Sequence, residues 1–361
     1  MVRLGVIGVG ANVFNMHGPA IKANALDVVG VADINLEAAE RRAEEFGCPF
    51  FADYHQLLAE TRPDAVVVIT PHPFHASVAV DALQAGAHVL VEKPMAVDVG
   101  EADLMIETAR REGRVLAVNL QHRTRPEIRA AKQLIQTGQL GELQRTQMLS
   151  MWTRPRRYFE VAAWRGTWRG EGGGVLMNQA AHTLDLICHL AGQPSQVVAW
   201  NRTLYHAIET EDTSLAMFEW PNGALGTLLV STAQAGDPER LEIAGTRGVL
   251  LLARGGLEVQ QTDTDLRTFL AESQDPFGKP TFQAREVVVE AEGGNHAAVY
   301  ANFVDAIEHG APLVADGAEG RLSLELANAL IYSSATRQPA SLPLDRAAYR
   351  DLLDRLRGRP G

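Results

Sequence analysis

Over its first third, the chain alternates short, uninterrupted apolar runs with amphipathic segments of helical period. The apolar runs predict strands at residues 4–9, 28–32, 65–69, 88–91 and 115–118, and the amphipathic segments predict helices at 36–46, 54–60, 75–85 and 99–112. Strands that are apolar on both faces need helices on both sides of their sheet, which is typical of parallel sheets. The repeated strand–helix–strand order therefore predicts a doubly wound α/β domain.

The pattern changes after residue 122, where we divide the chain into domains at residues 1–122 and 123–361. Longer, more alternating strands are expected at 143–152, 196–205, 213–220, 223–230, 240–244 and 249–252, and helices at 127–137, 296–309 and 319–336. Pro221-Asn222 and the segment from Gly245 to Gly248 predict hairpin turns, and residues 269–283 predict an exposed loop. The second part thus predicts an α+β domain with a largely antiparallel, open sheet.

Composition limits the classes of function. The formal net charge of −11 over 361 residues argues against nucleic acid and anionic membrane surfaces as partners. No apolar run approaches the roughly 18 residues that a membrane-spanning helix needs, and a strand near the first residue leaves no room for a signal peptide. Cys48 and Cys188 form neither a disulfide framework nor a metal-ligand spacing, so we expect a cytoplasmic location and no metal.

A glycine-rich turn follows the first predicted strand. Gly8 permits a tight turn, and Gly10 lets the backbone approach a pyrophosphate, which helix N-terminal amides then bind. Asn12 lies in the same turn, and Val13 replaces the third glycine of the dinucleotide-binding fingerprint. Residues 17–19 predict an extended loop, with regular helix resuming at the proline.

Asp33 ends the second predicted strand, twenty residues beyond Val13. A carboxylate there accepts hydrogen bonds from the adenosine ribose hydroxyls and repels a 2′-phosphate. Ile34 and Asn35 offer no compensating cation, so the sequence favours NAD over NADP. The alternative is that Asp33 only caps the following helix.

Residues 172–189 carry the most informative polar pattern. Placed on one helix, Asn178, His182, Asp185 and His189 share a face among Leu, Met, Ala, Ile and Cys. Polar groups on such an apolar helix face a wet cleft, a ligand or buried partners. We expect Asn178, His182 and Asp185 to contact the ligand and His189 to have a structural role. The alternative is that all four are buried side chains with hydrogen-bond partners inside the protein.

Glu92-Lys93-Pro94 follows the fourth predicted strand, at the edge where open α/β sheets bind ligands. Together with the glycine turn, Asp33 and the Asn178-to-Asp185 segment, it resembles the Gfo/Idh/MocA family of glucose–fructose oxidoreductases and inositol dehydrogenases. The similar segments also include Thr70 to His75, Ala85 to Pro94 and Gly245 to Gly248.

The resemblance implies a Rossmann domain at residues 1–122 that binds NAD(P), and a substrate-binding and oligomerisation domain at 123–361. It implies hydride transfer between the nicotinamide and a secondary alcohol or ketone of a sugar, sugar acid, cyclitol or sugar nucleotide. Lys93 matches the family's active-site lysine and His182 its catalytic histidine. Asn178 stands where aspartate is frequent, and an amide cannot relay a proton. A dimer or tetramer, formed through the outer face of the sheet, is also implied.

The site residues expected from sequence fall into three groups. The catalytic group is Lys93, His182 and Asn178. The cofactor group is Gly8, Gly10, Asn12, Val13, Asp33, Thr70, Pro71, His75, Glu92, Lys93, Asn119 and Gln121. The substrate group is Lys93, Arg123, Tyr158, Trp164, Arg165, Asn178, His182 and Asp185.

His182 is the expected proton acceptor, and Lys93 is expected to polarise the substrate oxygen. The alternative is that a desolvated lysine exchanges roles with the histidine. Five arginines, Arg154, Arg156, Arg157, Arg165 and Arg169, suit a uronate or sugar nucleotide, or else a solvated loop or an oligomer contact. Two other functions stay open: an NAD-dependent glycosidase that works by oxidation and elimination, and a non-catalytic sugar-sensing regulator.

Overall fold

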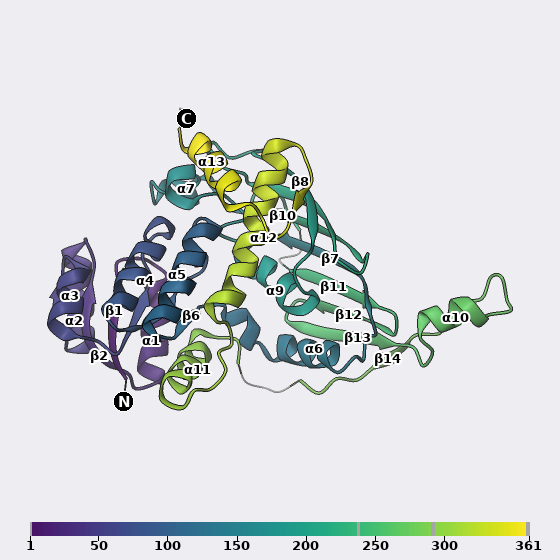
Figure 1. The fold of residues 1–361 in the computed structure, drawn as a ribbon, viewed down its shortest axis with the longest axis horizontal. Coiled ribbons are helices and arrows are strands. Elements are labelled where there is room, and N and C mark those ends of the chain that lie inside the picture. Colours follow the sequence, from purple (N-terminus) through teal and green to yellow (C-terminus); the bar gives the residue numbers. More distant parts are fainter. Residues whose placement is uncertain (1, 237–238, 290–292, 359–361) are drawn as a thin grey trace.

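The computed structural model describes residues 2–236, 239–289 and 293–358. Two sheets lie toward opposite ends of the long axis, with helices α9 and α12 between them (Figure 1). The first sheet has six parallel strands in the order β3-β2-β1-β4-β5-β6. Its strands are β1 (Arg3–Ile7), β2 (Asp27–Ala32), β3 (Phe50–Phe51), β4 (Ala65–Val68), β5 (His88–Val91) and β6 (Leu116–Val118).

The helices of this first layer are α1 (Phe14–Ala23), α2 (Leu36–Phe46), α3 (Tyr54–Thr61), α4 (His75–Gln84) and α5 (Val99–Glu112). Every residue of β4 is buried, as expected for a strand covered on both faces. The strand order changes direction between β1 and β4, and a crevice at the carboxyl ends of the strands is expected at such a point. The doubly wound α/β prediction is confirmed.

The second sheet has nine strands in the order β14-β13-β12-β11-β7-β10-β9-β8-β15. All neighbouring strands are antiparallel except β7 and β10, which are parallel. The strands are β7 (Leu143–Met151), β8 (Gln196–Arg202), β9 (Thr213–Glu219), β10 (Leu225–Ser231), β11 (Arg240–Gly245), β12 (Gly248–Ala253), β13 (Gly256–Gln261), β14 (Gln283–Arg285) and β15 (Ala340–Ser341). Both predicted hairpins, β9–β10 and β11–β12, are present.

The remaining helices are α6 (Pro126–Gln136), α7 (Arg156–Glu160), α8 (Trp168–Glu171), α9 (Ala181–Ala191), α10 (Leu266–Glu272), α11 (His296–His309), α12 (Gly317–Thr336) and α13 (Arg346–Arg357). Helix α12 contacts β8 and α9 on one side and α5 and β6 on the other. Helix α11 packs against α1 of the first layer. The chain therefore returns to its N-terminal layer, and one apolar core runs through both sheets.

One expectation about local structure was wrong, and a second holds for only part of its range. Helix α1 runs unbroken through residues 17–19, with Pro19 inside it, where a loop was expected. A side chain at Gly18 would lie only 3.3 Å from the Phe14 ring, so the glycine permits close packing rather than ending the helix. The exposed loop expected at residues 269–283 is present at 273–282, because residues 269–272 belong to α10 and residue 283 to β14. The α10 segment projects away from the body (Figure 1).

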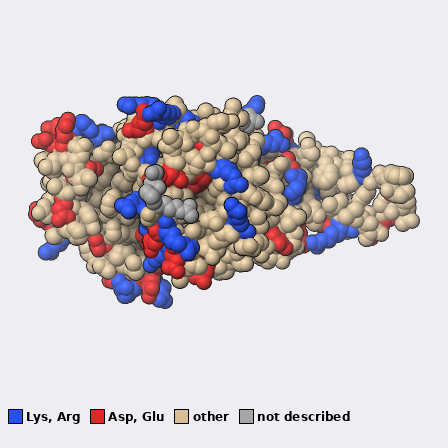
Figure 2. All heavy atoms as spheres, turned by 90° about the horizontal axis from the view of Figure 1, so that it is seen from above, with Lys and Arg blue, Asp and Glu red and all other residues tan. Residues whose placement is uncertain are grey.

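None of the described helices combines the length and hydropathy of a membrane-spanning segment. On the face shown in Figure 2, Lys and Arg atoms are interspersed with Asp and Glu atoms. That face therefore carries no continuous basic field of the kind that binds nucleic acid.

Candidate active site

The glycine turn after β1 is built by close backbone approach. Gly8 has a φ of +97°, and a Cβ there would lie 2.6 Å from the carbonyl carbon of Ile69. The Gly10 N–H donates a 2.7 Å hydrogen bond to Oδ2 of Asp33. A Cβ at Gly10 would lie 2.9 Å from the same carboxylate oxygen. Glycine is therefore required at position 8, and a side chain at position 10 would displace the Asp33 carboxylate that the turn holds at the carboxyl end of β2.

Asp33 is not the cap of helix α2. Asn35 is the N-cap, and its side chain accepts a hydrogen bond from the Ala38 N–H. The Asp33 carboxylate instead accepts from the backbone of Gly10 and Asn35. The alternative role considered for Asp33 is therefore wrong. On the other side of the turn, Val13 occupies the N-cap of α1 and makes no side-chain cap, and Asn12 is exposed.

His75 ties together two loops at the carboxyl edge of the sheet. Its Nε2 lies 2.6 Å from the Thr70 carbonyl oxygen, and its Nδ1 lies 2.8 Å from the Pro94 carbonyl oxygen. Burial lowers the pKa of His75. The side chain thus fixes the position of Thr70-Pro71 relative to Lys93-Pro94, two segments that were expected to contact the cofactor.

Glu92 is the centre of a buried polar cluster from four elements. His17 Nε2 on α1 lies 3.0 Å from Oε1, and the Asn119 side-chain amide donates to the same oxygen. His17 Nδ1 in turn lies 2.8 Å from the hydroxyl of Tyr300 on α11. Burial opposes the charged form of Glu92, but hydrogen bonds from His17 and His296 outweigh it and hold its pKa well below the ordinary value. A carboxylate beside Lys93 therefore stays ionised.

Sequence reasoning missed His17, His296 and Tyr300 as members of this site. The donor atoms of His17, Glu92 and His296 lie within 4.8 Å of one another, the one such group in the described ranges that could hold a metal ion. Both ring nitrogens of His17 already contact protein atoms. The expected absence of a metal stays a prediction.

Lys93 extends from the first layer to the second. Its Nζ donates a 3.1 Å hydrogen bond to the backbone carbonyl of Asn178. Burial lowers the pKa of the Lys93 ammonium, and the negative charges of Glu92 and Glu171 oppose that shift. The amine therefore lies at the junction of the two layers, next to the segment that leads into α9.

His182 lies in the first turn of α9, stacked on His122 with ring centroids 4.1 Å apart and planes at 16°. Burial lowers its pKa well below the ordinary value, and His122 and Lys93 lower it further. Its Nδ1 is buried and has no hydrogen-bond partner. His182 is thus a neutral imidazole with a free ring nitrogen, and the nearby positive charge of Lys93 opposes its protonation.

Asn178 precedes α9 rather than lying on it, because the helix begins at Ala181. The prediction that Asn178, His182, Asp185 and His189 share one helix face is therefore wrong for Asn178. The Asn178 side-chain amide donates to Glu171, whose other oxygen accepts from the Gly166 N–H at 2.5 Å. Burial raises the pKa of Glu171 to about 7.

The glycines before Asn178 are required by close packing. A Cβ at Gly174 would lie 1.9 Å from the backbone oxygen of Glu211. The Glu211 carboxylate accepts from the Gly174 N–H at 2.8 Å and the Leu176 N–H at 3.1 Å. Burial raises the pKa of Glu211 to about 7 as well. Two buried acids thus flank the segment that presents Asn178 to Lys93.

Arg123 and Asp185, both expected near the substrate, bind each other. The Arg123 guanidinium donates to the Asp185 carboxylate from Nε at 3.0 Å and from its terminal nitrogen at 2.7 Å. It also contacts Glu319 and the Val314 carbonyl oxygen. Asp185 has no exposed surface and Arg123 is 4 % exposed. This ion pair joins residues before α6 to α9 and α12.

Tyr158 and Arg165 lie beside the Asn178 segment. The Arg165 guanidinium carbon is 4.1 Å from the Tyr158 ring centroid, and that of Arg154 is 5.2 Å from it. The Tyr158 hydroxyl accepts a 2.9 Å hydrogen bond from Gln179. Trp164 lies edge-on to His72, with ring centroids 5.4 Å apart. The exposed Arg156 and Arg157 pair with Glu160, and Arg169 donates to the Arg357 carbonyl oxygen.

Several buried polar atoms near the carboxyl edge of the first sheet have no hydrogen-bond partner. They indicate whether a dinucleotide could bind there. They are Thr70 Oγ1, Asn119 Oδ1, Gln121 Oε1 and His182 Nδ1. Unsatisfied buried groups are costly, and a carboxamide or ribose hydroxyl would pair with them. With the glycine turn and Asp33 on the same edge, the residues present fit a dinucleotide that carries a nicotinamide.

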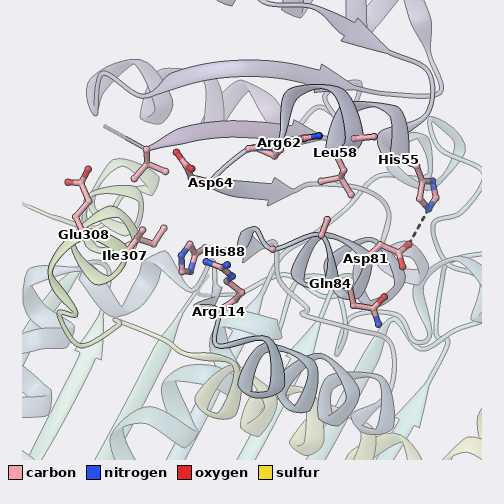
Figure 3. Close-up of a pocket in the computed structure, with 15 residues that line it drawn as sticks. His55, Leu58, Arg62, Asp64, Asp81, Gln84, His88, Arg114, Ile307 and Glu308 are labelled. Atoms are coloured by element: carbon pink, nitrogen blue, oxygen red, sulfur yellow. Dashed lines mark ion pairs between the residues drawn. The ribbon is translucent and has the colours of Figure 1, made fainter.

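Two cavities help to locate the site. The larger, of about 1090 Å³, lies at the amino ends of the parallel strands, with Asp64, His88 and Arg114 on its walls (Figure 3). It is therefore on the opposite edge from Gly8, Lys93 and Asn119. A cavity of about 660 Å³ is bounded by Pro71, Phe74 and Trp164. This smaller cavity lies between Pro71, which was expected to bind the cofactor, and Trp164, which was expected to bind the substrate.

Comparison with known families settles the relationship. The model of the oxidoreductase family with an NAD-binding Rossmann fold matches residues 2–120, and the GFO/IDH/MocA C-terminal domain matches residues 128–251. The chain belongs to the Gfo/Idh/MocA family. The family predicted from sequence is confirmed.

Relatives and solved structures of similar sequence are oxidoreductases. D-glucoside 3-dehydrogenase of Escherichia coli is 31% identical over 224 residues, covering 61% of this chain and 62% of the relative. The NADP(+)-dependent scyllo-inositol 2-dehydrogenase IolW of Bacillus subtilis is 26% identical, covering 94% and 96%. The WlbA dehydrogenase of Bordetella pertussis, solved with NADH and UDP-GlcNAcA, has a TM-score of 0.81 and 28% identity, covering 95% and 99%.

The match spans less than two thirds of three of the curated relatives. It covers 62% of the glucoside dehydrogenase, 58% of a 1-carboxy-3-chloro-3,4-dihydroxycyclohexa-1,5-diene dehydrogenase of Comamonas testosteroni and 41% of a UDP-N-acetylglucosamine 3-dehydrogenase of Acidithiobacillus ferrooxidans. The levoglucosan dehydrogenases, at 22% identity and TM-scores near 0.8, share the fold. Family and fold are thus shared along the chain, and the named relatives differ in substrate.

Proposed function

We propose that this chain is an NAD-dependent dehydrogenase that oxidises a secondary alcohol of a carbohydrate-like molecule, or reduces the corresponding ketone. The observation that carries this proposal is the hydrogen bond from Lys93 Nζ to the Asn178 carbonyl, four residues before His182, together with the effect of the Lys93 charge on the pKa of His182. A cation and a neutral base at one point are what removal of a hydroxyl proton requires. The unpartnered Thr70, Asn119 and Gln121 atoms support cofactor binding at the same edge.

In the oxidising direction, His182 accepts the hydroxyl proton because its lowered pKa keeps the ring neutral. Lys93 donates a hydrogen bond to the substrate oxygen and stabilises its developing negative charge. Glu92 stays ionised beside Lys93 and preserves the ammonium form. A bound nicotinamide would supply the hydride acceptor. Asn178, whose side-chain amide donates to Glu171, places its backbone carbonyl oxygen on Lys93 Nζ.

The substrate class is proposed from the side chains around Tyr158. Arg165 and Arg154 stack on its ring, and stacked guanidinium groups bind carboxylates and phosphates well. A sugar acid or sugar nucleotide would fit this environment. The test is a panel of sugars, uronates, cyclitols and sugar nucleotides with NAD and NADP, followed by the absorbance of the reduced cofactor. No net reduction with any member would contradict the proposal and favour a redox-neutral or non-catalytic role.

Cofactor preference depends on Asp33. Replacing Asp33 with alanine removes the carboxylate that faces the ribose hydroxyls and repels a 2′-phosphate. We expect KM for NAD to rise about 10- to 100-fold, the size expected for a lost charge-assisted hydrogen bond, while KM for NADP changes less. Asp27→Ala, at the exposed amino end of the same strand, is the matched control. An unchanged ratio of the two cofactor efficiencies would refute the assignment.

A cytoplasmic homo-oligomer completes the proposal. The outer face of the second sheet exposes Trp200, Leu215, Met217 and Leu225, which are 46 %, 47 %, 49 % and 61 % exposed on β8, β9 and β10. Such a contiguous apolar face is typical of a protein interface. We expect a dimer or tetramer by sedimentation, converted to monomer by Met217→Glu. Leu104→Glu on α5, also half-exposed, is the control, and a monomeric wild type would exclude this interface.

A further inference from the structure

Glu171 is a buried acid that the mechanism above does not use. It ends α8 and is 2 % exposed. One oxygen accepts from the Gly166 backbone, and the other accepts from the Asn178 side-chain amide. In the described part of the chain no lysine, arginine or histidine forms an ion pair with it. An unpaired buried carboxylate is costly, so its position calls for an explanation.

Asn178 connects this acid to the amine. Its side chain donates to Glu171, and its backbone carbonyl accepts from Lys93 Nζ at 3.1 Å. Holding the side chain fixes the orientation of the residue and hence the direction of its carbonyl. The segment on which Asn178 lies is otherwise held by Glu211, through the Gly174 and Leu176 N–H groups. Glu171 is therefore the acid that fixes the orientation of Asn178 toward Lys93.

We propose that Glu171 is a positioning residue for the Lys93 ammonium: through Asn178 it holds the carbonyl that binds Nζ, and its negative charge keeps the amine protonated. This inference rests on the proposed function only for its catalytic consequence. The contacts and the charge on which it depends belong to the chain itself.

The charges around Glu171 determine the pH range in which it acts. Burial raises its pKa to about 7, the negative charge of Glu211 adds to that shift, and Arg165 opposes it. His72 is packed against the Glu171 backbone, and burial keeps it uncharged by lowering its pKa well below the ordinary value. Glu171 is thus ionised above about pH 7. Burial lowers the pKa of Lys93, and the ionised Glu171 raises it again in that same range.

The chain allows this effect to be measured without turnover. It contains four lysines, Lys22, Lys93, Lys132 and Lys279. Reductive methylation with a ¹³C label gives each amine a separate titrating signal, and a dimethylated Nζ still keeps one N–H for the Asn178 carbonyl. The Lys93 signal is assigned by its loss in Lys93→Arg. Titration of the full chain then reports the pKa of Lys93 directly, with the other three lysines as internal references.

In Glu171→Gln the charge is lost, but the amide can still bond Asn178 once the Asn178 amide has turned over. We expect the pKa of Lys93 to fall by about half a unit to one unit, which is the size of a partly screened charge interaction. Glu171→Asp keeps the charge and should show a smaller fall. Glu211→Gln, the same change on the other buried acid, should leave the Lys93 signal in place. The three reference lysines should not move in any variant.

Turnover gives the second readout. If the proposed function holds, Glu171→Gln should lower kcat severalfold above pH 8 and move the alkaline limb of the kcat profile to lower pH, with KM for NAD unchanged. An identical Lys93 titration in wild type and Glu171→Gln would overturn this inference, and so would an equal shift in Glu211→Gln. Absence of turnover in the wild type, with the Lys93 shift present, would instead remove the proposed function and leave this inference standing.

Discussion

Lys93→Ala should lower kcat by about a thousandfold or more while NAD still binds with the affinity of the wild type. The Lys93 ammonium reaches from the first layer to the Asn178 carbonyl, 3.1 Å away. In the proposed mechanism, its loss removes both the hydrogen bond that polarises the substrate oxygen and the positive charge beside the developing alkoxide. We propose that cofactor binding depends mainly on the glycine turn and Asp33, which this change does not touch.

The measurement is steady-state turnover beside a binding titration with NADH fluorescence. Lys279→Ala is the matched control, because it removes the same side chain from the exposed segment after α10 and should leave both quantities unchanged. Normal turnover by Lys93→Ala would remove the proposed mechanism. Weakened NADH binding without any loss in kcat would make Lys93 a cofactor-binding residue only.

Arg123→Met should destabilise the fold by about 3–5 kcal/mol, the cost of leaving one member of a buried ion pair without its partner. Asp185 has no exposed surface, and burial already raises its pKa against the stabilising charge of Arg123. The substitution also removes the contacts to Glu319 and the Val314 carbonyl oxygen. The free energy of unfolding from urea titration tests this prediction.

A double variant separates a structural role from a role in substrate binding. Combining Arg123→Met with Asp185→Leu replaces the pair by apolar groups and should recover most of the lost stability. Arg111→Met removes an exposed arginine that pairs with Glu112 and should cost less than about 1 kcal/mol. If Arg123→Met keeps the stability of the wild type and raises only KM for the sugar, the pair binds substrate as expected from sequence.

The local periodicity of apolar residues, together with capping residues, is enough to predict several of the helices. Residues 36–46, 99–112 and 296–309 were expected as helices and are α2, α5 and α11 with the same bounds. Each has a capping residue with an oxygen side chain before it and a glycine after it in the left-handed conformation. These signals lie within the segment itself, so no tertiary information is needed to detect them.

The same reasoning failed where a turn has the composition of a buried helix. Residues 175–180 are apolar around Asn178 and continue the period of α9, but they form turns that pack on Glu211. Their hydrophobic spacing reflects burial, which helices and compact turns share. Gly174 lies where the chain packs against the Glu211 backbone, since a Cβ there would collide with it. In the sequence, however, three consecutive glycines are equally compatible with the start of a helix.

The cluster around Glu92 lies beyond any local signal. His17, His296 and Tyr300 are far from Glu92 in sequence and meet it only because α11 returns to pack on α1. The same return explains why the Arg123–Asp185 pair reaches Glu319 at the start of α12. Sequence could place Gly8, Asp33 and Lys93 at one edge of the sheet, whereas the residues that contact Glu92 there could be found only from tertiary packing.

A structure of the protein with NAD and a substrate analogue tests the central claim most directly. We expect the nicotinamide at the carboxyl edge of the first sheet, with its carboxamide on the Asn119 and Gln121 oxygens. Its reactive carbon should lie about 3–3.5 Å from the analogue's carbinol carbon, with Lys93 Nζ and His182 both within hydrogen-bond distance of the analogue's oxygen. A nicotinamide bound elsewhere, or an oxygen that contacts neither side chain, would contradict the account.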